Sequence, residues 1–119
     1  MRKVFIVNNS SHDFSAAKKF GELVFLSDGP INRYATNSMI RDFGELMVDS
    51  SPGDHIVPCS LNVMNSIACA IFAAAHGRLN LLLFKDGNYI ERNHILKKGK
   101  VKEDDNKKDV RKMEKGSIT

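Results

Sequence analysis

The residues of this sequence best suited to chemistry are neutral hydrogen-bonding side chains that follow two short apolar runs. One group comes directly after residues 4–7, and the other follows residues 55–59, where the chain enters a longer apolar segment. Hydroxyl and amide groups can hold phosphate oxygens, and they can also cap helices or shape turns. The pattern therefore favours a binding site over a catalytic one. The residues concerned are Asn8, Ser10, Ser60, Asn62 and Asn65.

Two arginines, a tyrosine and a histidine complete the candidate site. Arg33 stands beside Tyr34, and such a pair can grip a phosphate and stack on a base. Arg92 offers a second phosphate partner, or it forms an ordinary exposed strand pair with Glu91. His12 offers a general base for an enzyme, or it is a loop histidine with no catalytic role.

The signatures of the large enzyme and metal-binding classes are absent from the sequence. There is no phosphate loop ending in Gly-Lys-Ser/Thr, and no GxGxxG, GxSxG, HExxH or CxxC motif. The remaining histidines and the two cysteines do not stand at metal-ligand spacing. We therefore expect no cofactor, no metal ion and two free thiols, and we expect binding without catalysis.

The net charge of +4 comes from the end of the chain. Residues 97–119 hold nine Lys or Arg and five Asp or Glu, which leaves nine basic and nine acidic residues in 1–96. Binding of long nucleic acid needs a basic face on the folded body, so we expect no such partner. The apolar run at residues 4–7 is too short for a signal peptide or a membrane span. These features predict a cytoplasmic protein with no membrane contact and a charged, flexible tail over residues 97–119.

Strand and helix patterns alternate along residues 1–96 and predict a single layered α/β domain. The Asp86-Gly87 pair is a strong signal for a tight hairpin turn. We expect a mostly parallel or mixed sheet of about five strands, with helices packed on it and a C-terminal β-hairpin. Strands are expected at residues 2–7, 22–27, 54–59, 78–84 and 88–92, and helices at 13–20, 36–47 and 61–75.

Several residues predict where these elements begin, end and bury their apolar side. Because proline lacks a backbone N–H, the strand that contains Pro58 should end there or lie at an edge of the sheet, and Gly77 should end the third helix. The segment 78–84 is apolar enough for the middle of a covered sheet. The expected helix caps are Asp13, Thr36, and either Ser60 or Asn62. The second helix should bury one stripe made of Met39, Ile40, Phe43, Leu46 and Met47.

The candidate site residues should converge at one edge of this sheet. In parallel α/β domains, ligands collect at the carboxyl ends of the strands, where loops and helix N-termini meet. The segments that follow the first three strands are residues 8–12, 28–34 and 59–65. They carry mostly neutral donors with one arginine and one histidine, which suits a phosphate or a nucleotide.

Two stretches resemble a group of small viral proteins. KVFIVNNSS, followed by a short helix, and SLNVMNSI, entering a helix after a strand, resemble the small α/β viral proteins that include the anti-CRISPR ring nucleases. The resemblance spans residues 2–96. In size and character the chain is also similar to the phage sponges that sequester cyclic signals, such as the Thoeris anti-defence proteins.

The resemblance implies a nucleotide held by a homodimer, and it implies a catalytic histidine shortly before a strand-to-helix junction. Here that neighbourhood reads Val57-Pro58-Cys59-Ser60 and contains no histidine. Binding without cleavage is therefore the better fit to the resemblance.

The sequence leads to one leading hypothesis with two alternatives. We expect a phage-encoded homo-oligomer in the host cytoplasm that binds a small signalling nucleotide and keeps it from a host defence effector. The first alternative is a metal-independent ring nuclease in which His12 assists attack by a ribose 2′-OH. The second is a viral adaptor that binds a host protein through the alanine-rich helix at 61–75 and the basic tail.

Overall fold

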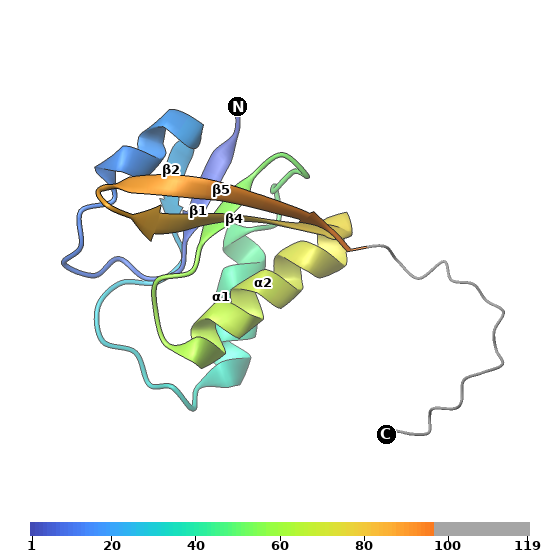
Figure 1. Cartoon of the computed structure of the whole chain (residues 1–119). Helices are drawn as coiled ribbons and strands as arrows, with labels where there is room; N and C mark the ends of the chain where they lie inside the picture. Colours follow the sequence, from blue (N-terminus) through green and yellow to red (C-terminus); the bar gives the residue numbers. More distant parts are fainter. Residues whose placement is uncertain (97–119) are drawn as a thin grey trace, which may run out of the picture.

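The computed structural model describes residues 1–96 as one mixed β-sheet with helices on both faces (Figure 1). This confirms the expected fold class, whereas the tail predicted at 97–119 lies outside the described residues. Two α-helices cover one face, and a short 3-10 helix lies on the other. The strands are β1 Lys3–Ile6, β2 Glu22–Phe25, β3 His55–Val57, β4 Arg78–Lys85 and β5 Asn88–Ile95, and the helices are η1 Ser15–Phe20, α1 Thr36–Leu46 and α2 Asn62–His76.

The strand order in the sheet is β2-β1-β3-β4-β5. The first four of these strands run parallel, and β5 returns antiparallel to β4. The hairpin turn has φ values of 51° at Asp86 and 84° at Gly87, as a two-residue turn of this type requires. The strand β3 ends directly before Pro58, and α2 is followed by Gly77 with φ 66°, so both predicted ends are confirmed.

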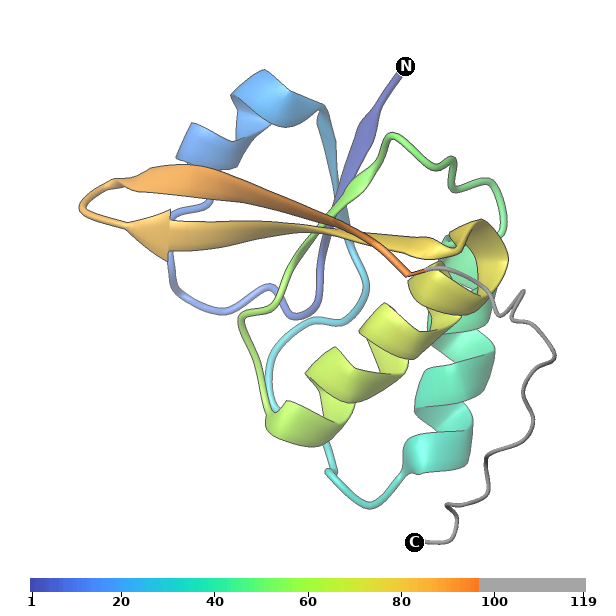
Figure 2. The same cartoon turned by 45° about the vertical axis from the view of Figure 1, so that its right-hand side comes forward.

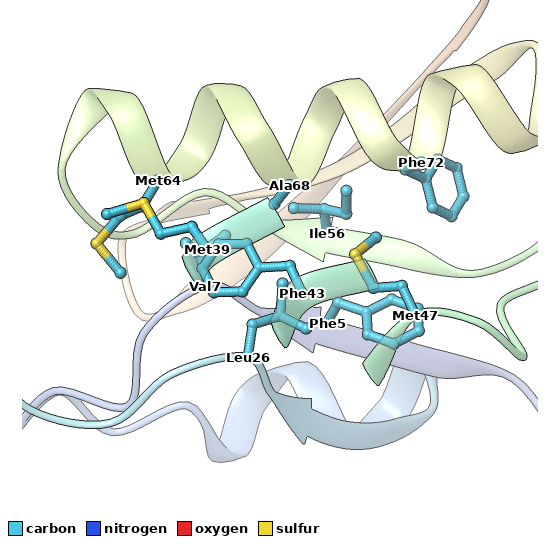
Figure 3. Close-up of a cluster of buried hydrophobic side chains, with 10 residues drawn as sticks. All are labelled: Phe5, Val7, Leu26, Met39, Phe43, Met47, Ile56, Met64, Ala68 and Phe72. Carbon is cyan, nitrogen blue, oxygen red and sulfur yellow. The ribbon is translucent and has the colours of Figure 1, made fainter. Parts of the chain in front are cut away.

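The hydrophobic core has one part on each face of the sheet. On the helical face, Phe5, Ile56 and Phe72 are fully buried between the sheet and the two helices (Figure 3). On the other face, Val4 and Ile6 pack in a second cluster with residues of η1. Since successive side chains of a strand point to opposite faces, β1 must be apolar at consecutive positions to serve both parts.

The predicted helix at 13–20 and the predicted stripe on α1 need correction. The first is a 3-10 helix, and its N-cap residue is Phe14 without a side-chain cap. Asp13 instead accepts a hydrogen bond from the Ser15 N–H at 2.9 Å, which closes a local turn. On α1, Ile40 and Leu46 are 53% and 45% exposed. The face of α1 that contacts the core is therefore narrower than the stripe of apolar residues in the sequence.

The strand β4 is covered over only part of its length. Leu82 is fully buried, but Leu83 and Phe84 are 41% and 50% exposed. The neighbouring strand β3 has only three residues, so the carboxyl half of β4 extends beyond it. Among residues 1–96, no helix has both the length and the apolar composition needed to cross a bilayer.

Candidate functional site

The three segments predicted to meet do lie together at the carboxyl edge of the sheet. The Asn8 Nδ2 donates to the Gly29 carbonyl at 3.2 Å, which ties the loop after β1 to the loop after β2. The Cys59 thiol donates to the Asn8 carbonyl at 3.6 Å, which ties the loop after β3 to the same place. The Ser27 hydroxyl donates to the Asn8 Oδ1 at 3.0 Å. Sequence reasoning did not single out Ser27. Asn8 therefore holds this edge together in the structure.

The first of two hollows at this edge lies at the beginning of α1 and α2, and we call it the Arg33 hollow. Its volume is about 770 Å³, within the usual size of a small-molecule site. Figure 2 shows α1 and α2 side by side with their first turns at the same end of the pair. Four predicted residues line it together with parts of both first turns. The lining residues are Arg33, Tyr34, Thr36, Ser60, Leu61, Asn62 and Val63.

The two helices that begin at the Arg33 hollow have no side-chain caps, so the predicted caps are wrong. The N-cap residue of α1 is Ala35 and that of α2 is Leu61. Neither side chain accepts a hydrogen bond from a backbone N–H of the first turn. Thr36 and Asn62 come one residue too late in the chain, as the first residues of their helices. Uncapped first turns direct backbone N–H groups and the positive end of the helix dipole outward, where an anion is favoured.

Ser60 and Asn65 are bound to each other across the first turn of α2. The Asn65 Oδ1 accepts from the Ser60 N–H at 3.3 Å, and the Asn65 Nδ2 donates to the Ser60 carbonyl at 3.0 Å. The Ser60 hydroxyl lies 3.2 Å from the Met64 sulfur, a weak acceptor. Asn65 therefore shapes the loop from outside the Arg33 hollow, while Ser60 is one of the residues that line it.

Arg33 and Tyr34 provide the charge and the ring of this hollow. Within residues 1–96 no carboxylate forms an ion pair with Arg33. The Tyr34 side chain is 83% exposed, and its backbone N–H donates to the Asn32 Oδ1 at 2.9 Å. A guanidinium next to an exposed ring can accept a phosphate and stack on a base.

The second hollow lies beside the β4–β5 hairpin, and we call it the Tyr89 hollow. Its volume is about 490 Å³, and it contains Ser10 and His12, which the sequence placed in one site with Arg33. The His12 ring packs edge-on against Phe14 at 5.0 Å and Phe84 at 4.8 Å between ring centroids. Sequence reasoning missed the aromatic residues here, because Phe84 and Tyr89 read only as strand residues.

Arg92 is in neither hollow. It lies on the edge strand β5 directly opposite Leu81 of β4, so its side chain shares the helical face of the sheet. Its position follows from the antiparallel return of the hairpin, which carries β5 away from the first three strands.

Burial favours the neutral forms of two cysteine thiols and one tyrosine phenol. Desolvation raises the pKa of the Cys59 and Cys69 thiols, and both cysteines are free, as expected. Burial also raises the pKa of the Tyr89 phenol, with smaller contributions from Cys59 and Asp13. Across residues 1–96 no cluster of three His, Cys, Asp or Glu side chains could hold a metal ion.

Comparison with known proteins gives one result. A family model described as "Phage Pam3 gp32-like protein" matches residues 2–95. Searches of curated proteins and of solved structures found no match.

Proposed function

We propose that this chain, which belongs to the phage Pam3 gp32-like family, binds a small phosphate-bearing signalling nucleotide in the Arg33 hollow and sequesters it without cleavage. The family makes it a phage protein, in agreement with the expected origin. Sequestration in the host cytoplasm would keep the nucleotide from a defence effector.

The observation that carries this proposal is the arrangement of two uncapped helix N-termini around one hollow. Thr36 of α1 and Asn62 of α2 both line it, and neither helix uses a side chain to cap its first turn. Each N-terminus favours negative charge, and two of them on one hollow add their effects. Arg33 adds a full positive charge on the same wall.

The other lining residues are suited to the rest of a nucleotide. The hydroxyl of Ser60 and the amide of Asn62 can bond to phosphate or ribose oxygens. The exposed ring of Tyr34 offers a face on which a base can stack.

Holding the ligand is better supported than cutting it. The ring-nuclease alternative needs His12 beside the phosphate, but His12 lies in the Tyr89 hollow and packs against two phenylalanines. The adaptor alternative depends partly on the tail, so deletion of residues 97–119 separates it from a sponge, which should keep its ligand. A homo-oligomer remains part of the proposal, and sedimentation of the full chain tests it.

The test is to identify what the protein retains. Purified protein is mixed with cyclic oligonucleotides and cyclic ADP-ribose isomers, freed of unbound ligand and heated, and the released compound is identified by mass spectrometry. Intact nucleotide in stoichiometric amount is expected, and Arg33→Ala should release at most a tenth of that amount. Arg41→Ala is the matched control, because Arg41 is exposed on α1 and pairs with Asp42 at 3.1 Å. A linear product, or equal retention by Arg33→Ala, would overturn the proposal.

A further inference from the structure

The Tyr89 hollow lies at the position in the sheet where α/β proteins most often bind ligands. From β1 the chain moves to β2 on one side, and from β3 it moves to β4 on the other, so the direction of winding reverses between β1 and β3. Ligands of open α/β sheets bind outside the carboxyl ends of the strands at this reversal. Ser10 and His12 come after β1, Pro58 and Cys59 come after β3, and all four line the hollow.

One buried polar group among the lining residues has no partner in the described part of the chain. The Tyr89 side chain is 4% exposed, and its hydroxyl is buried without a hydrogen bond to any group of residues 1–96. A buried tyrosine hydroxyl normally has a partner, because an unsatisfied one loses its hydrogen bonds to water without replacement. A ligand atom in the hollow would supply the missing bond.

Two polar groups close to Tyr89 already have partners in the structure. The Cys59 thiol donates to the Asn8 carbonyl at 3.6 Å, and Asp13 accepts the Ser15 N–H at 2.9 Å. Among the buried side-chain N and O atoms of the lining residues, the Tyr89 hydroxyl is the one without a partner in residues 1–96.

The walls that residues 1–96 form around this hollow are aromatic and apolar and carry no lysine or arginine. Phe84 packs edge-on against His12 at 4.8 Å and against Tyr89 at 5.2 Å. Leu82 and Val57 add apolar surface. Such walls favour a flat, uncharged ring system over a phosphate, in contrast with the Arg33 hollow.

We infer that the Tyr89 hollow binds a planar, uncharged aromatic heterocycle of nucleobase size, with a ring nitrogen or oxygen bonded to the Tyr89 hydroxyl. The inference does not rest on the proposed function, because it concerns different residues and a ligand without phosphate.

The test uses adenine as the probe and the full chain labelled with ¹³C-tyrosine. The chain has two tyrosines, and the Tyr89→Phe variant assigns their signals. Adenine should shift the ring signals of Tyr89, and the shift should persist in inorganic phosphate, which separates this site from the Arg33 hollow. Titration calorimetry should show adenine binding about threefold to tenfold more weakly to Tyr89→Phe, the loss expected for one hydrogen bond.

Tyr89→Phe should fold normally because the hydroxyl that it removes bonds to no other group in residues 1–96. Phe84→Ala is a second variant at a half-exposed position, and it should weaken adenine binding through loss of ring contact. The inference fails if millimolar adenine leaves the Tyr89 signals unmoved, or if folded Tyr89→Phe binds adenine as tightly as the unchanged protein.

Discussion

The two ends of the sheet differ in how far their polar residues are paired, although the Nδ1 of buried His55 at the amino end also has no partner within residues 1–96. At the amino end, Asp54 is 1% exposed and accepts the backbone N–H groups of Lys3 at 2.9 Å and Ser51 at 2.8 Å. Asn80 is 2% exposed and donates to the carbonyls of Pro52 at 2.7 Å and Asp54 at 2.8 Å. At the carboxyl end, within residues 1–96, two helix N-termini lack side-chain caps and the Tyr89 hydroxyl has no partner.

This difference separates stability from binding. Saturated buried polar groups stabilise the fold, because removing one partner leaves the others desolvated and unpaired. Groups without partners add nothing to stability, and a buried one lowers it, but they remain available to a ligand. Substitutions at the amino end should therefore change the free energy of unfolding, and those at the carboxyl end should change affinity.

The largest expected effect is at Asp54. Asp54→Ala should lower the free energy of unfolding by about 3 kcal/mol, because two backbone N–H groups lose a charged acceptor. Urea denaturation measures this change. Asp49→Ala is the matched control at an exposed position and should stay within about 0.5 kcal/mol of the unchanged protein. If the two variants were equally stable, the hydrogen bonds of Asp54 would not stabilise the amino end of the sheet as we infer.

A second prediction concerns binding at the carboxyl end. The double variant Arg33→Ala with Asn62→Ala should lose ligand affinity by about tenfold or more, since a charged hydrogen-bonding group and a neutral one are removed. Its urea midpoint should barely move, because neither side chain is buried. Arg92→Ala is the control for charge and should retain ligand fully, since Arg92 lies outside the hollow. Loss of ligand in Arg92→Ala instead would move the phosphate site toward β5.

The smallest expected effect is a pH dependence at the amino end. The Glu91 Oε2 lies 2.6 Å from the Nε2 of buried His55, and this hydrogen bond, with a smaller one from Asn93, lowers the pKa of Glu91. A carboxyl group with a lowered folded-state pKa stabilises the protein above its unfolded pKa, and this contribution is lost as pH falls through the folded value.

Measured stability should therefore decline on acidification below about pH 4.5, and the decline should be shallower in Glu91→Gln. The exposed Glu45→Gln is the matched control and should keep the slope of the unchanged protein. A Glu91→Gln curve that parallels the unchanged protein at all pH values would show that the pair with His55 contributes nothing to folding.

Local residue chemistry was sufficient to predict most of the architecture. The Asp86-Gly87 turn, Pro58 after β3 and Gly77 after α2 act through their own backbone geometry, so they could be read without the fold. The order of strands and helices followed from apolar periodicity. The predicted caps were wrong because a cap residue must stand directly before the first helical residue. Apolar periodicity does not predict the first helical residue to within one position.

The sequence by itself determined the elements, their order and the convergence of three polar loops at one edge of the sheet. Only the tertiary structure decided that six of the nine candidate residues divide between two hollows, while Asn8, Asn65 and Arg92 line neither. Crossover connections are right-handed, so the connection from β1 to β2 lies on the opposite face from the connections to β3 and β4, which run the other way along the sheet. His12 therefore lies with the hairpin and Arg33 with the two helix N-termini, because strand order, which no local pattern encodes, assigns each loop to its face.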